Sequence, residues 1–233
     1  MQAIIKMKKF FYIIISLLAI NQAQAQLHEI GVFGGGANYI GDIGKTNYIA
    51  PNEPAFGIIY KWNRSKRHSW RFSAITGKIS GNDLESKIPG REDRGFKFEN
   101  NVTELSAGLE FNFFDFDLHQ QPFFVTPYIY TGLSYFKYDN LYFIGNLQRT
   151  EKDSWAMAIP MTVGIKMKIS NKLVLGLESG ARYTFADDLD GSFPKSNTLS
   201  HLKFGNTNSK DWYVFTGATL TYTFGQNPCF CVE

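Results

Sequence analysis

The sequence DWYVFTGATLTYTF at residues 211–224 alternates in character from each residue to the next. One set of alternate residues is largely apolar and the other is more polar: Trp212, Val214, Thr216, Ala218, Leu220, Tyr222 and Phe224 against Tyr213, Phe215, Gly217, Thr219, Thr221 and Thr223. Because successive side chains of a strand point to opposite faces, the first set suits lipid and the second suits a crowded polar interior. The pattern predicts an outer-membrane β-barrel, in which a closed sheet pairs every backbone group.

Seven further segments have the character of strands, so the predicted fold is all-β, an eight-stranded antiparallel transmembrane β-barrel. The expected strands cover residues 27–37, 55–63, 68–77, 101–113, 123–138, 155–169, 173–185 and 211–224. The connections alternate between long and short, which is typical of bacterial barrels with short periplasmic turns and long external loops. A soluble β-sandwich is the alternative, but it would not explain this asymmetry of the loops.

All four tryptophans fall near the expected strand ends. Trp62 and Trp70 flank the first short turn, whereas Trp155 and Trp212 begin strands that follow long loops. This distribution is typical of the aromatic girdles that lie at the two membrane interfaces.

In four more strands, alternate residues form a lipid-facing set, or phase, and an interior-facing one. The apolar phase comprises Phe56, Ile58, Tyr60, Trp62, Leu105, Leu109, Phe111, Trp155, Met157, Ile159, Met161, Val163, Ile165, Met167, Leu173, Leu175, Leu177, Ala181, Tyr183 and Phe185. The other phase carries charges: Lys61, Glu104, Glu110, Lys166, Lys168, Glu178 and Arg182. Since an isolated buried charge costs several kcal/mol, we expect Lys166 and Lys168 to pair with Glu178 or with acids on neighbouring strands. Residues 27–37 and 123–138 show no clean phase, so their facing is left open.

The first residues predict a secretory signal peptide. Lys6, Lys8 and Lys9 precede an apolar run at residues 10–20, which is followed by Ala23-Gln24-Ala25, although Met7 could also be the start. The expected division is therefore a signal peptide at 1–25, a barrel at 26–225 and a C-terminal tail at 226–233, with both mature termini in the periplasm. Cleavage removes three lysines and no acids, so the formal charge falls from +3 to zero. That balance argues against nucleic acid as a partner.

The histidines argue against an enzyme. His28, His68 and His119 are expected at the periplasmic edge, and His201 in an external loop. None lies in mid-strand beside a serine, so no nucleophile and base pair is available within the membrane. His201 with a nearby aspartate could form a base at the rim, but solvated loop residues explain it better. We therefore expect no catalytic residue, no cofactor and no small-molecule substrate.

Two short motifs suggest ligand binding only weakly. Asp187-Asp188-Leu189-Asp190-Gly191 resembles the start of a calcium loop but lacks its distal glutamate, so turn chemistry is preferred and no metal is predicted. The glycines at 31 and 34–36 lack the dinucleotide-binding spacing, and they indicate a bend or a close passage within the first strand.

Two segments on the periplasmic side are candidate partner-binding residues. The first is the basic turn Arg64, Lys66, Arg67 and His68, and the second is the tail with Cys229, Phe230 and Cys231. Free thiols do not persist in an oxidising periplasm, so we expect these cysteines to be joined to each other or to another chain. The apolar Phe230 between them is expected to dock on a partner or on the lower rim of the barrel.

Three stretches together resemble a known family. They are GGANYIGDIG at residues 35–44, the segment 51–71, and RYTF at 182–185. They resemble the PorG-like outer-membrane barrel of the type IX secretion system, and the resemblance extends from about residue 27 to the end of the last strand. The segment NYIGDIG at 38–44 is its most specific part.

The resemblance implies a non-enzymatic component of the secretion apparatus. Its partners would be membrane lipid and, on the periplasmic side, the ring of the lipoprotein PorK with PorN, called GldK and GldN in gliding relatives. An eight-stranded barrel encloses just enough space for its own side chains, so it cannot be the conduit for folded proteins. The alternatives are a small adhesin or membrane-stability barrel and, less favoured, an outer-membrane hydrolase.

Overall fold

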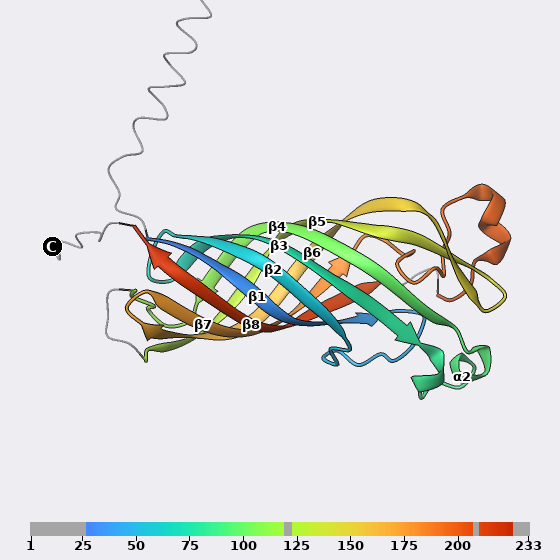
Figure 1. The fold of residues 1–233 in the computed structure, drawn as a ribbon, viewed down its shortest axis with the longest axis horizontal. Helices are drawn as coiled ribbons and strands as arrows, with labels where there is room; N and C mark the ends of the chain where they lie inside the picture. Colours follow the sequence, from blue (N-terminus) through green and yellow to red (C-terminus); the bar gives the residue numbers. More distant parts are fainter. Residues whose placement is uncertain (1–26, 119–122, 207–209, 226–233) are drawn as a thin grey trace, which may run out of the picture.

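The computed structural model describes residues 27–118, 123–206 and 210–225, and it shows one closed antiparallel barrel (Figure 1). Each strand pairs with the next in the chain, and the last pairs with the first. The eight strands are β1 (Leu27–Ile40), β2 (Glu53–Asn63), β3 (His68–Asn82), β4 (Lys97–Asn112), β5 (Val125–Ile144), β6 (Leu147–Ser170), β7 (Leu173–Thr184) and β8 (Trp212–Phe224). The predicted fold class and strand count are confirmed.

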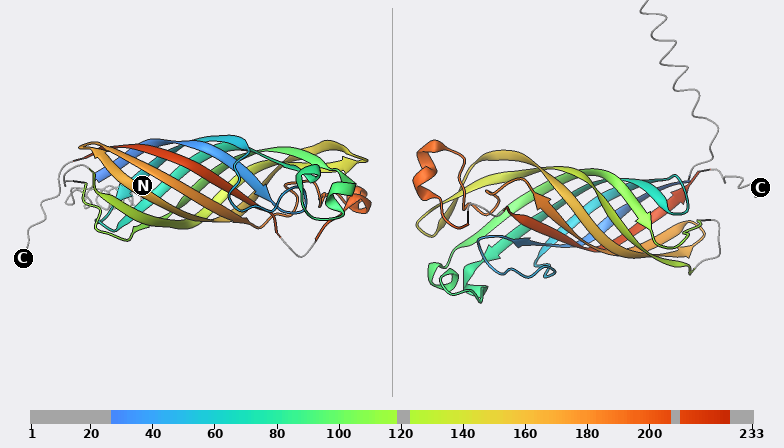
Figure 2. Two further views of the ribbon diagram at one scale, coloured as in Figure 1. Left: turned by 90° about the horizontal axis from the view of Figure 1, so that it is seen from below. Right: turned by 180° about the vertical axis from the view of Figure 1, so that it is seen from behind.

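The two ends of the barrel differ. Residues 64–67, 113–118, 123–124 and 171–172 of the connections lie at one end, here named the short-turn end, where β1 begins and β8 ends (Figure 1). Residues 41–52, 83–96, 185–206 and 210–211 gather at the opposite end, named the long-loop end (Figure 2). They contain the short helical elements η2 (Asp83–Glu85), α2 (Arg91–Arg94) and η3 (Asn197–Leu202). Within the described ranges, no helix is long and apolar enough to cross a membrane.

Four strands, β3 to β6, run further toward the long-loop end than the alternation predicts. The long loop expected at residues 139–154 is wrong, because most of it belongs to the hairpin of β5 and β6, which turns at Gly145 with φ of +59°. Trp155 therefore lies inside β6 instead of opening it. Charged residues such as Asp139 and Asp153, which face each other in this ladder, end the lipid-facing pattern although strand pairing continues.

The outward-facing residues form an apolar belt, and the inward-facing residues are buried. In β4, every second residue from Phe98 to Asn112 is buried, and those between are exposed or half-buried. The outward residues predicted for β2, β4, β6, β7 and β8 are confirmed except Val214, which is 2% exposed. Val214 pairs with Asn38, over which residues 47–50 fold and hydrogen-bond.

The structure also resolves the two strands without a clean phase. In β1, Ile30 and Val32 face outward, whereas Glu29 and Phe33 are buried inside. The same alternation holds in β5, where exposed Ile129 separates buried tyrosines. A closed sheet leaves no unpaired edge in lipid, and its apolar belt suits hydrocarbon, so the chain is an integral outer-membrane β-barrel.

Candidate functional site

Buried charges fill the lumen near the short-turn end. The carboxylate of Glu110 accepts hydrogen bonds from Lys61 at 2.9 Å and from Lys166 at 2.5 Å, and Arg71 Nη1 lies 3.6 Å from Glu110 Oε2. All four residues are at most 2% exposed. Three cations therefore surround one carboxylate in a space closed to water.

A second pair crosses the lumen beside the first. The Arg71 guanidinium donates to both oxygens of Glu178 at 2.7 Å, and the Tyr128 hydroxyl donates to the same carboxylate. The guanidinium also stacks on the ring of Tyr130. Bidentate pairing of this kind is both strong and geometrically specific. Since β3 and β7 lie on opposite walls, the pair braces the barrel across its interior.

Lys166 is paired with an acid as expected, but that acid is neither Glu178 nor a residue of an adjacent strand. Lys166 meets Glu110, two strands away, and Lys168 donates to the carbonyl of Leu118 at 2.7 Å. Glu178 is bound instead by Arg71, which the sequence did not single out. Inward side chains in so narrow a barrel meet across the lumen, so strand adjacency does not predict their partners. The alternation of Arg71 with outward Trp70 and Phe72 would have placed it inside.

Above this network the lumen becomes mostly aromatic and aliphatic. Arg182 Nε lies 3.2 Å from Glu104, whose other contact is the hydroxyl of Tyr213 at 2.6 Å. Around and above them, a buried apolar cluster fills the space: Phe33, Ile59, Ile75, Ile79, Phe98, Val102, Phe136, Ala158 and Phe215 are its main members. The described side chains thus fill the lumen from the charged layer to the long-loop end.

The Asp-rich segment folds into the mouth of the barrel at the long-loop end. Asp188, Leu189 and Asp190 are at most 1% exposed. The Tyr39 hydroxyl lies 2.7 Å from Asp190 Oδ2 and also contacts Asp211 Oδ1. Asp188 instead accepts a hydrogen bond from the hydroxyl of Tyr138 at 2.6 Å. Asp190 and Asp211 thus share one phenol and Asp188 binds another, and no three metal-ligating side chains converge anywhere in the described part of the chain.

Burial changes the acidity of Asp190 and Asp211, the two carboxyl groups that contact Tyr39. It raises the pKa of the Asp190 carboxyl, and it raises the pKa of the Asp211 carboxyl well above its usual range, with the nearby Asp190 adding to the effect. Among described residues, no cation lies within 4 Å of either carboxylate. The ion pairs of the segment involve its other acids, and they join Asp188 to Lys195 at 3.1 Å and Asp187 to Lys210 at 3.9 Å.

The segment at residues 38–44, the most specific part of the family resemblance, connects three loops at this mouth. Arg91 donates to the carbonyl oxygens of Gly41 at 2.9 Å and Gly44 at 2.8 Å, and Arg94 donates to that of Asp42 at 2.8 Å. A side chain at position 41 would collide with the Tyr39 hydroxyl, so the segment needs glycine there. The sequence indicated neither this hub nor the burial of the Asp-rich segment.

At the short-turn end, the four basic-turn residues proposed as a partner site lie together. Lys66 pairs with Asp117 at 3.0 Å, and Arg67 pairs with Asp115, both acids belonging to the connection after β4. The guanidinium of Arg64 stacks instead on the ring of Trp62 at 4.9 Å. His68 lies 3.2 Å from the Ser65 hydroxyl. The remaining candidates Cys229, Phe230 and Cys231, with His119 and the signal peptide, lie outside the described residues.

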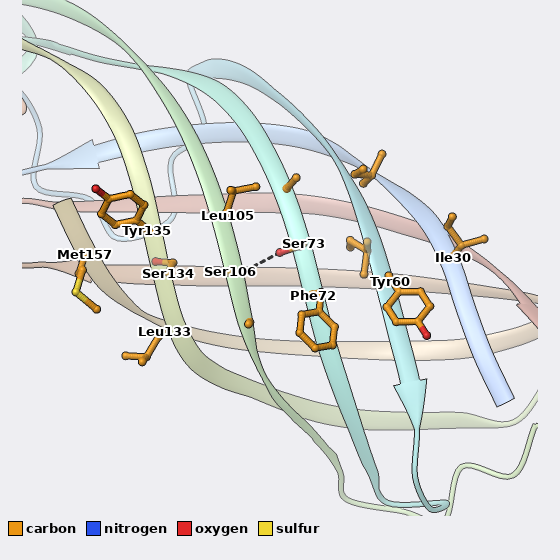
Figure 3. A pocket seen from close by; sticks show the side chains of 14 residues that line it. Ile30, Tyr60, Phe72, Ser73, Leu105, Ser106, Leu133, Ser134, Tyr135 and Met157 are labelled. Atoms are coloured by element: carbon orange, nitrogen blue, oxygen red, sulfur yellow. Dashed lines mark hydrogen bonds between the residues drawn. The ribbon is translucent and has the colours of Figure 1, made fainter. Parts of the chain in front are cut away.

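A groove of about 540 Å³ crosses the outer wall over β1 to β6, from Ile30 to Met157 (Figure 3). Ala74 and Ala107 leave space there between the larger side chains of Phe72 and Leu105. Its lining is almost wholly apolar and it opens within the lipid-facing belt, so it suits a hydrocarbon chain. Alternation could not reveal the groove, because an alanine and a leucine both count as apolar positions.

Comparisons with known proteins bear on the family and on the fold. A family model described as "Domain of unknown function (DUF6089)" matches residues 8–233. No curated protein matches the sequence. Among solved structures, Ail of Yersinia pestis in complex with the heparin analogue sucrose octasulfate is 11% identical, with a TM-score of 0.47 and coverage of 86% of this chain and 99% of that one.

Two other solved barrels are similar at the same level. Neisserial surface protein A is 11% identical, with a TM-score of 0.44 and coverage of 85% of this chain and 97% of that one. The N-terminal β-barrel domain of Pseudomonas aeruginosa OprF is 11% identical, with a TM-score of 0.41 and coverage of 87% and 100%. Similarity this distant concerns the barrel and not its ligands or partners.

Proposed function

We propose that this chain, which belongs to the DUF6089 family, is a non-enzymatic outer-membrane component of the type IX protein secretion system. In this role it anchors the periplasmic ring of PorK and PorN, or GldK and GldN, to the outer membrane. The resemblance of residues 35–44, 51–71 and 182–185 to the PorG-like barrels suggests the system. The filled lumen supports an anchor over a conduit, because the described side chains leave no path for a secreted protein.

The proposal assigns the short-turn end to the periplasm, together with both termini. Short turns face the periplasm in bacterial barrels, and a partner there meets the basic turn at residues 64–68. Lys66 and Arg67 are already paired with acids of the same protein, whereas Arg64 has no carboxylate partner among the described residues. Arg64 is therefore the cation of this turn best placed to meet an acidic group of the ring.

Affinity purification from solubilised outer membranes tests the proposal. A tagged wild-type chain is expected to recover PorK and PorN, and Arg64→Glu is expected to reduce that recovery without loss of membrane insertion. Arg149→Glu is the matched control, since Arg149 is an exposed arginine at the long-loop end with no carboxylate within 4 Å among the described residues. Failure of the wild-type chain to recover either ring protein would overturn the proposed function.

A further inference from the structure

The contact of Tyr39 with two aspartates constrains the number of protons at the mouth. The Tyr39 hydroxyl is within hydrogen-bonding distance of Asp190 and of Asp211 at once. A phenol carries one hydrogen, so it can donate to only one carboxylate. The other contact is a hydrogen bond only if that carboxyl is protonated and donates to the phenol oxygen.

The remaining oxygens of the two carboxyl groups are already occupied. The Ser192 amide donates to Asp190 Oδ1 at 2.8 Å, and the Leu189 amide donates to Asp211 Oδ2 at 3.0 Å. These bonds orient both side chains toward Tyr39. With these bonds in place, the oxygens that face the phenol are the ones open to a proton shared among Tyr39, Asp190 and Asp211.

The surroundings do not supply a cation to neutralise a second negative charge. Asp42 and Asp187 add negative charge nearby, and Tyr138 of β5 donates to Asp188. Lys195 is paired with Asp188 at 3.1 Å, and Lys210 lies near Asp187. Arg91 and Arg94 bind backbone carbonyls of residues 41–44, and Arg94 also binds Asp83.

We propose that Asp190, Asp211 and Tyr39 form a proton-operated latch, which holds the segment at residues 187–192 in the barrel mouth. With one shared proton, both contacts of Tyr39 are hydrogen bonds and the pair carries a single negative charge. Loss of that proton removes one hydrogen bond and leaves two buried carboxylates in mutual repulsion. The segment then leaves the mouth. This inference does not depend on the proposed role in secretion.

The direction of the pH effect follows from the burial of the pair. Because burial raises the pKa of both carboxyl groups in the closed mouth, the closed state binds more protons than the open state. The latch is therefore complete at low pH and weakens as the pH rises through the raised pKa. Linkage to one proton changes the closing equilibrium by about tenfold per pH unit in that range.

Hydrogen exchange of the full-length barrel in lipid nanodiscs tests the latch. The readout is the protection factor of peptides that contain residues 187–192, corrected for intrinsic base catalysis, between pH 5 and pH 10. We expect this protection to fall by up to about tenfold per pH unit as the pH rises above the usual range of an aspartate, and to level off once the pH exceeds the raised pKa. Peptides from β4 serve as the internal reference and are expected to remain protected.

The variant Asp211→Asn tests whether the Asp211 carboxyl causes the pH dependence of this protection. A carboxamide reproduces the protonated form, because it donates to Tyr39, accepts from the Leu189 amide and has no charge, so this variant should stay protected without pH dependence. Asp187→Asn, which leaves the Tyr39 contacts intact, should keep the pH dependence, with its midpoint displaced toward lower pH because one neighbouring negative charge is lost. If Asp211→Asn does not insert, Asp190→Asn replaces it. Wild-type protection independent of pH, or an unchanged profile in the asparagine variant, would overturn the latch.

Discussion

Two groups of buried acids in this barrel are neutralised in different ways. In the lumen, Glu110 and Glu178 are bound by cations that reach them from other strands. At the mouth, Asp190 and Asp211 meet a phenol and backbone amides, with no cation within 4 Å in the described chain. The first arrangement is neutralised by cations of the barrel wall, whereas the second depends on a proton.

The difference follows from where the two groups lie. The lumen cluster is built on strands of a closed sheet, so its cations are held at a fixed distance by the barrel wall. The mouth is built by loops that a strand-bound cation does not reach. The ion pairs in the lumen and the proton-dependent closure of the mouth can therefore exist in one molecule.

Glu110→Gln is expected to have the largest effect on stability. It leaves the ammonium groups of Lys61 and Lys166 buried together without a carboxylate. Loss of one partner from a buried ion pair costs about 3–5 kcal/mol. Equilibrium unfolding in guanidinium chloride from lipid vesicles measures this cost. A loss below about 1 kcal/mol would show that the lumen cations do not need this acid, and the comparison with the mouth would fail.

Arg71 and Glu178 should show strong energetic coupling. Each single change, Arg71→Met or Glu178→Gln, leaves a buried charge without its bidentate partner and should destabilise the barrel. The double variant removes both charges and should recover part of the loss, with a coupling energy of about 0.5–3 kcal/mol. The same unfolding measurement on all four proteins completes the cycle. Additive losses would mean that the two residues act independently.

Asp211→Asn should cost less than about 1 kcal/mol at the low-pH end of the protection profile, where the latch is complete, because the carboxamide replaces a protonated carboxyl and retains its hydrogen bonds. The contrast with Glu110→Gln is the sharpest test of the comparison, since both changes replace a buried acid with its amide. Unfolding of the two variants under identical conditions gives the difference. Equal losses would indicate that Asp211 is ionised in the closed mouth.

Much of the barrel wall could be predicted from the sequence, whereas the arrangement of the side chains inside the barrel could not. Alternation identifies which face of β6 or β7 meets lipid, because the membrane imposes one rule on every outward position. It places Lys166 inside but not opposite Glu110, since strand tilt decides which inward residues share a level. The alternation also stops being informative at Asp139, where the lipid-facing apolar pattern ends although the hairpin of β5 and β6 continues. The destination of the Asp-rich segment depends on how a long loop folds back, which no local pattern records.

The smallest expected effect is on ion conduction, which should be absent in the wild type at any pH. The mouth and the lumen are separate closures, and only the mouth is expected to respond to a proton. Even with residues 187–192 displaced, the Arg71 and Glu178 pair and the apolar cluster above it still fill the lumen. Planar bilayers with purified protein at pH 6 and pH 9 measure this directly, with an established porin as the positive control. Silence at both values supports two independent closures. Steady conductance that appears only at pH 9 would show that the mouth alone seals the barrel, and conductance at both values would contradict a filled lumen.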